Sequence, residues 1–259
     1  MRAAHLDSAD LSKLSEEFVH IGDINPFYES PIIRSGSGYI TPHLPALRYS
    51  LYNTFYYDLS SLESYGDPSG SSGGEFGDKW GEYIEEWAYD SLAMTFSPSE
   101  IFFNPYYKSD NGSWEEAADI LILHEQYLLV LECKSKKLVL SSRGGSQTSA
   151  VDDLDKGIGE ATEQATSLIS TLEGRGSIEI RTDTQQTTVV ESGIKSKYPV
   201  VVLGEQYDIV GNDLFASALG LSRTPWVVST YDLQIICDLL HPLSFISYVS
   251  QRPCVKRTK

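Results

Sequence analysis

The sequence predicts a layered α/β fold, in which helices flank a mixed β-sheet. Residues 75–96 and 152–172 carry apolar side chains at helical spacing, which is the pattern of amphipathic helices. Residues 118–124 and 127–134 are apolar runs separated by two residues, which predicts two strands joined by a tight turn. Residues 198–204, YPVVVLG, are apolar throughout, as expected of a strand covered on both faces of a sheet.

The first helix and a first strand precede this hairpin. The apolar stripe of residues 75–96 consists of Phe76, Trp80, Ile84 and Trp87. Pro98 marks the end of the helix, and residues 100–107, EIFFNPYY, are strand-like. The core order is therefore helix, three strands, helix and strand, and such elements pack as helices on a mixed sheet.

The remaining elements follow the hairpin. The second helix is expected to bury Ile158, Ala161, Ala165, Leu168 and Leu172. Residues 177–190 predict a peripheral hairpin and residues 225–229 a further strand. Residues 232–240 predict a closing helix, with Asp232 or Thr230 as its N-cap.

Two parts of unequal size are expected. Residues 1–74 form an N-terminal accessory segment, and residues 75–259 form the principal domain with a C-terminal extension. The Gly/Ser-rich stretch 64–77, SYGDPSGSSGGEFG, predicts a flexible connection between them.

Composition and charge narrow the class of protein. No run of 18 apolar residues occurs, so no membrane span is expected. The three cysteines form no CxxC pair, which indicates a reducing, cytoplasmic environment and argues against structural zinc. The net charge of −16 repels nucleic acid at long range, so any nucleic-acid site must be a local basic patch.

Charged residues interrupt the two apolar strands of the hairpin. If Glu125 and Gln126 form a two-residue turn, Asp119 lies directly opposite Glu132, with Cβ atoms about 4.5–5.5 Å apart. Lys134 is two residues beyond Glu132 and shares its face. The alternative is structural, with Asp119 capping its strand and Glu132 forming an edge salt bridge with Lys134.

Two carboxylates this close repel each other unless a cation lies between them. Mg²⁺ takes one or two carboxylates together with waters and substrate phosphate, and the backbone carbonyl of Cys133 is a further candidate ligand. Lys134 could position or deprotonate a water, or stabilise phosphate charge. The Cys133 thiol is expected to point to the opposite face and be buried, so a Cys133–His124 nucleophile is disfavoured.

The pattern Asp119–(12 residues)–Glu132–Cys133–Lys134 on the second and third strands resembles the PD-(D/E)xK nuclease superfamily, over about residues 75–205. In particular, it is similar to bacterial and phage-type members. The resemblance implies a restriction-endonuclease-like fold and Mg²⁺-dependent phosphodiester hydrolysis, with Mn²⁺ able to substitute. Asp119, Glu132 and Lys134 match the family's motif, whereas Ala118 replaces the proline of its name.

Two helical positions also follow from the resemblance. Many such nucleases carry a Glu on the first helix, for which Glu85 is favoured here, with Glu82 in reserve and Glu86 pointing further away. A solvated face is the alternative for all three. Gln164 on the second helix resembles the Gln found near the scissile phosphate in several branches, and Glu160 could share that role.

Basic residues cluster after the catalytic strand. Lys136, Lys137 and Arg143 are candidate nucleic-acid contacts, and an ordinary exposed strand end is the alternative.

The sequence therefore predicts a metal-dependent nuclease, with DNA the expected substrate. By analogy, its role would be restriction, anti-phage defence or repair. Cutting two strands needs two sites, which favours a homodimer, and a partner protein supplying DNA targeting would reconcile nuclease chemistry with the acidity. The competing hypothesis is a non-catalytic binding or scaffold module of the same fold, which the net charge of −16 favours.

Overall fold

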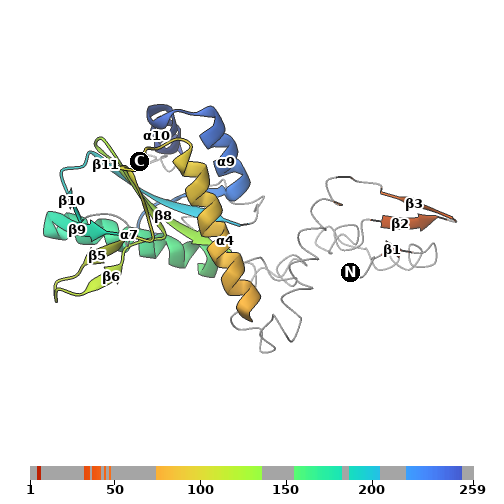
Figure 1. Ribbon diagram of the computed structural model, residues 1–259, viewed down its shortest axis with the longest axis horizontal. Coiled ribbons are helices and arrows are strands. Elements are labelled where there is room, and N and C mark those ends of the chain that lie inside the picture. Colours follow the sequence, from red (N-terminus) through yellow and green to blue (C-terminus); the bar gives the residue numbers. More distant parts are fainter. Residues whose placement is uncertain are drawn as a thin grey trace. The chain divides into compact units, whose positions relative to one another are not determined.

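The computed structural model describes residues 5–6, 32–35, 37–41, 44, 47, 74–135, 155–182, 187–204 and 220–252 (Figure 1). The chain divides into two compact units. The first comprises Met1–Trp80 and Leu138–Asp153, and the second comprises Gly81–Lys137 and Leu154–Lys259. No helix in the described part of the chain is long and apolar enough to cross a membrane.

The first unit contains a small sheet of three strands in the order β1-β2-β3. These strands are β1 (His5–Leu6), β2 (Ile32–Ser35) and β3 (Gly38–Ile40). Residues 64–73 of the predicted flexible connection lie outside the described residues. Its last residues, 74–77, are instead helical, because they begin α4 (Gly74–Ala93). The proposed boundary between an accessory segment and a principal domain remains a prediction.

The second unit is built on a mixed sheet of five strands in the order β12-β11-β8-β7-β4. Its strands are β4 (Ile101–Phe103), β7 (Ile120–His124), β8 (Tyr127–Lys134), β11 (Ser196–Leu203) and β12 (Trp226–Ser229). Strands β4, β7 and β8 pair antiparallel, whereas β11 runs parallel to both β8 and β12. The mixed α/β architecture predicted from the sequence is confirmed.

The register of β7 and β8 is the one predicted for a two-residue turn. His124 pairs with Tyr127, and Ile120 pairs with Leu131. The turn residue Glu125 adopts a φ of 51°, the left-handed conformation that tight hairpins require. The next position outward on each strand is Asp119 and Glu132.

Helices cover this sheet. They are α4, α7 (Glu160–Arg175, preceded by a short π-helix at Asp155–Gly159), α9 (Thr230–Leu239) and α10 (Pro242–Gln251). The five residues predicted to face inward from the second helix are all buried. In Figure 1, α7 lies below the strands of the main sheet, and α9 and α10 lie above them. α10 was not predicted from the sequence.

A second, antiparallel sheet has the strand order β10-β9-β5-β6. Its strands are β5 (Tyr106–Lys108), β6 (Trp114–Glu116), β9 (Ser177–Arg181) and β10 (Thr188–Glu191). The predicted hairpin over residues 177–190 is therefore present, and β9 joins it to β5. Apolar residues of this sheet and of α7 share one buried cluster, which includes Ile180, Val190 and Leu172.

Two local predictions were wrong. Residues 100–107 are two strands in different sheets, because Asn104 turns at a φ of 46° and Pro105 has no N–H to continue a ladder. The N-cap of α9 is Ser229, whose Oγ accepts a hydrogen bond from the Asp232 amide at 3.1 Å. Thr230 is the first helical residue, and Asp232 supplies the capped N–H.

Candidate functional site

Asp119 is held at the entrance of β7 by both neighbouring strands. Its backbone carbonyl accepts a hydrogen bond from the Asn104 amide at 2.8 Å. Its side-chain Oδ2 accepts a hydrogen bond from the Cys133 amide of β8 at 2.5 Å. The carboxylate is buried, and this bond fixes it beside Glu132, as the predicted register requires.

Glu132 and Lys134 project from the same face of β8, because they are two residues apart on a strand. The Glu132 side chain is buried. The Lys134 Nζ lies 3.5 Å from Glu132 Oε2 and donates a hydrogen bond to Gln164 Oε1 at 2.9 Å. The ammonium therefore bridges the strand carboxylate and an amide of the second helix.

The sequence of α7 explains how Gln164 reaches Lys134. Ala161 and Ala165 are fully buried on either side of Gln164 in the sequence, and such small residues allow a helix to approach a sheet closely. Gln164 itself is exposed apart from its bond to Lys134. Glu160 is exposed in the first turn of the helix.

Of the three carboxylates considered on α4, Glu85 lies at the site. Burial raises the pKa of Glu85 to about 7, the negative charges of Asp119 and Glu116 add to the rise, and Lys134 opposes it. Glu82 and Glu86 are exposed. Helix α4 packs closely on the ends of two strands. A Cβ on Gly204, directly after β11, would lie 2.9 Å from Ile84 Cδ1, and one on Gly81 would lie 3.7 Å from Oγ of Ser135, directly after β8.

The strand carboxylates are also harder to ionise than usual. Burial raises the pKa of Glu132 to about 8, Asp119 adds to the rise, and Lys134 opposes it. Burial likewise raises the pKa of Asp119, against the Cys133 hydrogen bond and Lys134. One ammonium thus stands among several carboxylates, an arrangement that favours the uptake of either a proton or a cation.

The donor set fits a hard divalent cation. Asp119 and Glu132 supply carboxylate oxygens from adjacent strands, which is the number of carboxylates that Mg²⁺ commonly takes alongside waters and phosphate. Among the residues that the structure describes, no group of three His, Cys, Asp or Glu side chains is placed to hold a metal ion. Any further ligands would therefore be backbone carbonyl, water or substrate oxygens.

Cys133 is not suited to nucleophilic catalysis. Its thiol is free and buried. Burial raises its pKa well above the ordinary value, and the charges of Asp119, Glu85 and Glu132 raise it further, so the reactive thiolate is disfavoured. His124 lies at the far end of β7, where its Nδ1 is 2.6 Å from Glu100 Oε1.

Glu116 is a site residue that the sequence did not indicate. It ends β6 and is exposed, and its charge raises the pKa values of Glu85, Asp119 and Glu132. The only indication of this role in the sequence is that Glu116 lies three residues before Asp119. The predicted basic contacts Lys136, Lys137 and Arg143 lie outside the described residues.

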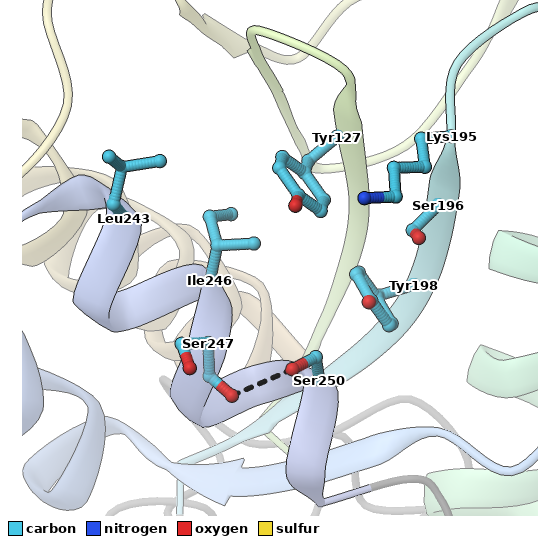
Figure 2. Close-up of a pocket in the computed structure, with 8 residues that line it drawn as sticks. All are labelled: Tyr127, Lys195, Ser196, Tyr198, Leu243, Ile246, Ser247 and Ser250. Atoms are coloured by element: carbon cyan, nitrogen blue, oxygen red, sulfur yellow. Dashed lines mark hydrogen bonds between the residues drawn. The ribbon is translucent and has the colours of Figure 1, made fainter.

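A pocket of about 300 Å³ lies away from this cluster (Figure 2). It is lined by Tyr127, Lys195, Ser196, Tyr198, Leu243, Ile246, Ser247 and Ser250. Tyr127 begins β8 and Lys134 ends it, so the pocket and the charged cluster lie at opposite ends of the strand. None of the site carboxylates contributes to its walls.

Comparisons with known proteins add little to this geometry. No protein-family model and no curated protein matches the sequence. Among solved structures, the chain is similar to the small subunit of the heterodimeric restriction endonuclease R.BspD6I, with a TM-score of 0.30 and 11% sequence identity. The match covers 78% of this chain and 97% of that chain. A score this low supports no conclusion about activity, so the function must be judged from the residues of the site.

Proposed function

We propose that the chain is a metal-dependent nuclease that hydrolyses phosphodiester bonds in nucleic acid, with DNA as its substrate. The observation that carries the proposal is the convergence of Asp119, Glu132 and Lys134 at one end of the inner strands β7 and β8, which are otherwise apolar. Burying two carboxylates is costly. A role in binding a cation explains why they stand together.

Mg²⁺ is the proposed cofactor, with Mn²⁺ as a substitute. Asp119, Glu132 and the backbone carbonyl of Cys133 would hold it. When bound there, the cation supplies an activated water and offsets charge on the phosphate in the transition state.

The chain's own residues perform the other tasks. The Lys134 ammonium offsets negative charge on the phosphate, and Gln164 holds that ammonium in place by accepting its hydrogen bond. The Glu85 carboxylate, with a pKa of about 7, can accept a proton from the attacking water at neutral pH. Lys136, Lys137 and Arg143 are proposed to contact backbone phosphates.

The proposal is tested by incubating supercoiled plasmid, single-stranded DNA and RNA with the full chain in Mg²⁺ or Mn²⁺. Cleavage is expected with either metal and is expected to stop with EDTA. Asp119→Asn and Lys134→Met should each lower the rate at least a hundredfold, the typical contribution of one such group. Glu191→Gln, which removes an exposed carboxylate on β10, should leave the rate unchanged. Cleavage that survives both site substitutions would contradict the assignment.

A non-catalytic binding module is the second candidate, and the net charge of −16 favours it. Calorimetric titration of Mn²⁺ separates the two candidates when no cleavage is seen. Binding that is lost in Asp119→Asn would indicate a competent site that needs another component. Absence of binding would favour the non-catalytic module.

A further inference from the structure

The helix α9 is apolar on two opposite faces. One face is buried in the second unit through Leu233 and Cys237. The other exposes Tyr231, Ile235 and Leu239, with exposed fractions of 45%, 56% and 74%. These three residues follow at intervals of four, so they form one continuous ridge along the helix, here called the outer ridge.

Helix α4 extends the apolar surface at one end of the outer ridge. The Trp87 ring of α4 meets the Tyr231 ring edge-on with centroids 4.7 Å apart. The half-exposed ring of Tyr83 lies beside Trp87, with centroids 5.8 Å apart. The Trp87 Nε1 donates to Gln234 Oε1 at 3.0 Å, which fixes α4 against α9.

The exposed charged residues of α9 are all acidic, and α4 adds two more carboxylates. Asp232 and Asp238 are exposed on α9 and flank the outer ridge, and Glu86 and Asp90 are exposed on α4. No Lys or Arg occurs in α9 or α10, whereas Lys79 is exposed on α4 one turn before Tyr83 and Arg252 is exposed directly after α10. The outer ridge is therefore an apolar strip whose immediate charged neighbours on α9, Asp232 and Asp238, form an acidic rim that Glu86 and Asp90 of α4 extend.

We propose that the outer ridge is the docking site for a protein partner whose contact segment is an amphipathic helix with apolar residues on one face and Lys or Arg on its flanks. Exposed apolar surface with a polar rim is typical of protein interfaces. The rim carboxylates select the sign of the partner's charge, because like charges across an interface oppose association. A second copy of this chain would bring the same carboxylates together, and each copy carries a net charge of −16.

Docking on this surface does not depend on the nuclease proposal. The outer ridge is built from α9, whereas the candidate active site is built from β7, β8, α4 and α7. Loss of cleavage in the variants of Asp119 or Lys134 and loss of binding in variants of the outer ridge are therefore separate outcomes.

The test is a selection of random displayed peptides on the full chain, with counter-selection on the double variant Ile235→Ser/Leu239→Ser. Both substituted residues are exposed, so the variant is expected to retain its circular dichroism and thermal midpoint. Enriched peptides should carry apolar residues at helical spacing together with Lys or Arg. A synthetic copy of the leading peptide should bind the double variant at least tenfold more weakly than it binds the wild type.

The contribution of the acidic rim to binding is tested with the same peptide and the double variant Asp90→Asn/Asp238→Asn. This variant should bind the peptide more weakly, and its affinity should depend less on the salt concentration. Enriched peptides without basic residues, or equal binding to wild type and Ile235→Ser/Leu239→Ser, would overturn the proposal. Sedimentation velocity of the chain alone tests whether a second copy of the chain occupies the outer ridge instead. Self-association that disappears in Ile235→Ser/Leu239→Ser would assign the outer ridge to a second copy and would also overturn the proposal.

Discussion

The properties of the candidate site come from a few side chains in an apolar setting. Asp119 and Glu132 are buried next to each other, and Lys134 is the cation that the structure places beside Glu132. Their meeting followed from strand alternation and a two-residue turn, and Glu85 was favoured among three glutamates of the first helix because of the family resemblance. Glu116 did not follow, because its position depends on β6, a strand that pairs with β5 and that the sequence did not indicate.

Glu132 should make the metal-free protein less stable as the pH rises. Its pKa is about 8 in the folded chain against an ordinary value of 4.5, so the folded state holds a proton that the unfolded state has released. The free energy of unfolding therefore falls between about pH 5 and pH 8. Urea unfolding in EDTA at pH 5 to 9 measures this slope. Glu132→Gln should reduce the slope. The remainder is assigned to Glu85, whose pKa is about 7, and to Asp119, whose pKa burial also raises.

The exposed variant Glu191→Gln should keep the full slope. Added Mn²⁺ should stabilise the wild type more at pH 8 than at pH 6, because ligands must lose their protons to bind metal. A wild type that becomes more stable from pH 5 to pH 8 in EDTA would contradict the shifted pKa of Glu132.

At the scale of elements, the strongly patterned segments were predictable. The apolar run 127–134 coincides with β8, and the run 118–124 begins two residues before β7. Strand breaks and helix ends that depend on the conformation of a single residue were not predictable from the pattern. Asn104 breaks a strand by adopting a left-handed conformation, and nothing in the spacing distinguishes Ser229 from its neighbours as the cap of α9.

The approach of α4 to the end of β11, which is hydrogen-bonded to the end of β8, depends on Gly204. A Cβ at this position would lie 2.9 Å from Ile84 Cδ1 and 3.0 Å from its Cγ1, and Ile84 is fully buried. Gly204→Ala should therefore lower the free energy of unfolding by about 1–3 kcal/mol through overpacking. It should also slow cleavage, because Glu85 follows Ile84 on the helix.

Gly193→Ala is the matched control, because a Cβ there meets nothing within 4 Å. Chemical denaturation of both variants measures the difference. Equal stability of Gly204→Ala and Gly193→Ala would show that the contact between α4 and the strand end is looser than described.

At the scale of the whole molecule, charge sets a limit on how nucleic acid can bind. A chain with a net charge of −16 gains nothing from long-range attraction, so affinity has to come from local contacts. The sequence places Lys136, Lys137 and Arg143 immediately after the strand that carries Lys134. The acidic rim of the outer ridge serves a different class of partner from the one these cations would bind.

The salt dependence of DNA binding tests whether Lys136 and Lys137 contact the phosphates of the nucleic acid. With Asp119→Asn as an inert background, the logarithm of the DNA affinity is plotted against the logarithm of the salt concentration. Adding Lys136→Ala/Lys137→Ala should reduce the slope by about 2, because each phosphate that a lysine neutralises contributes roughly 0.9. Lys195→Ala, which removes an exposed lysine at the opposite end of β8, should leave the slope unchanged. An equal change in both variants would place the nucleic acid elsewhere.

The central claim is that Asp119 and Glu132 form a hydrolytic metal site. The most direct measurement is the initial rate of plasmid nicking by wild type and Asp119→Asn in the same Mn²⁺ titration, with circular dichroism as the check of the fold. The account predicts a rate that rises with Mn²⁺ for the wild type and is at least a hundredfold lower for a folded Asp119→Asn at every concentration. Equal rates for the two proteins would contradict it.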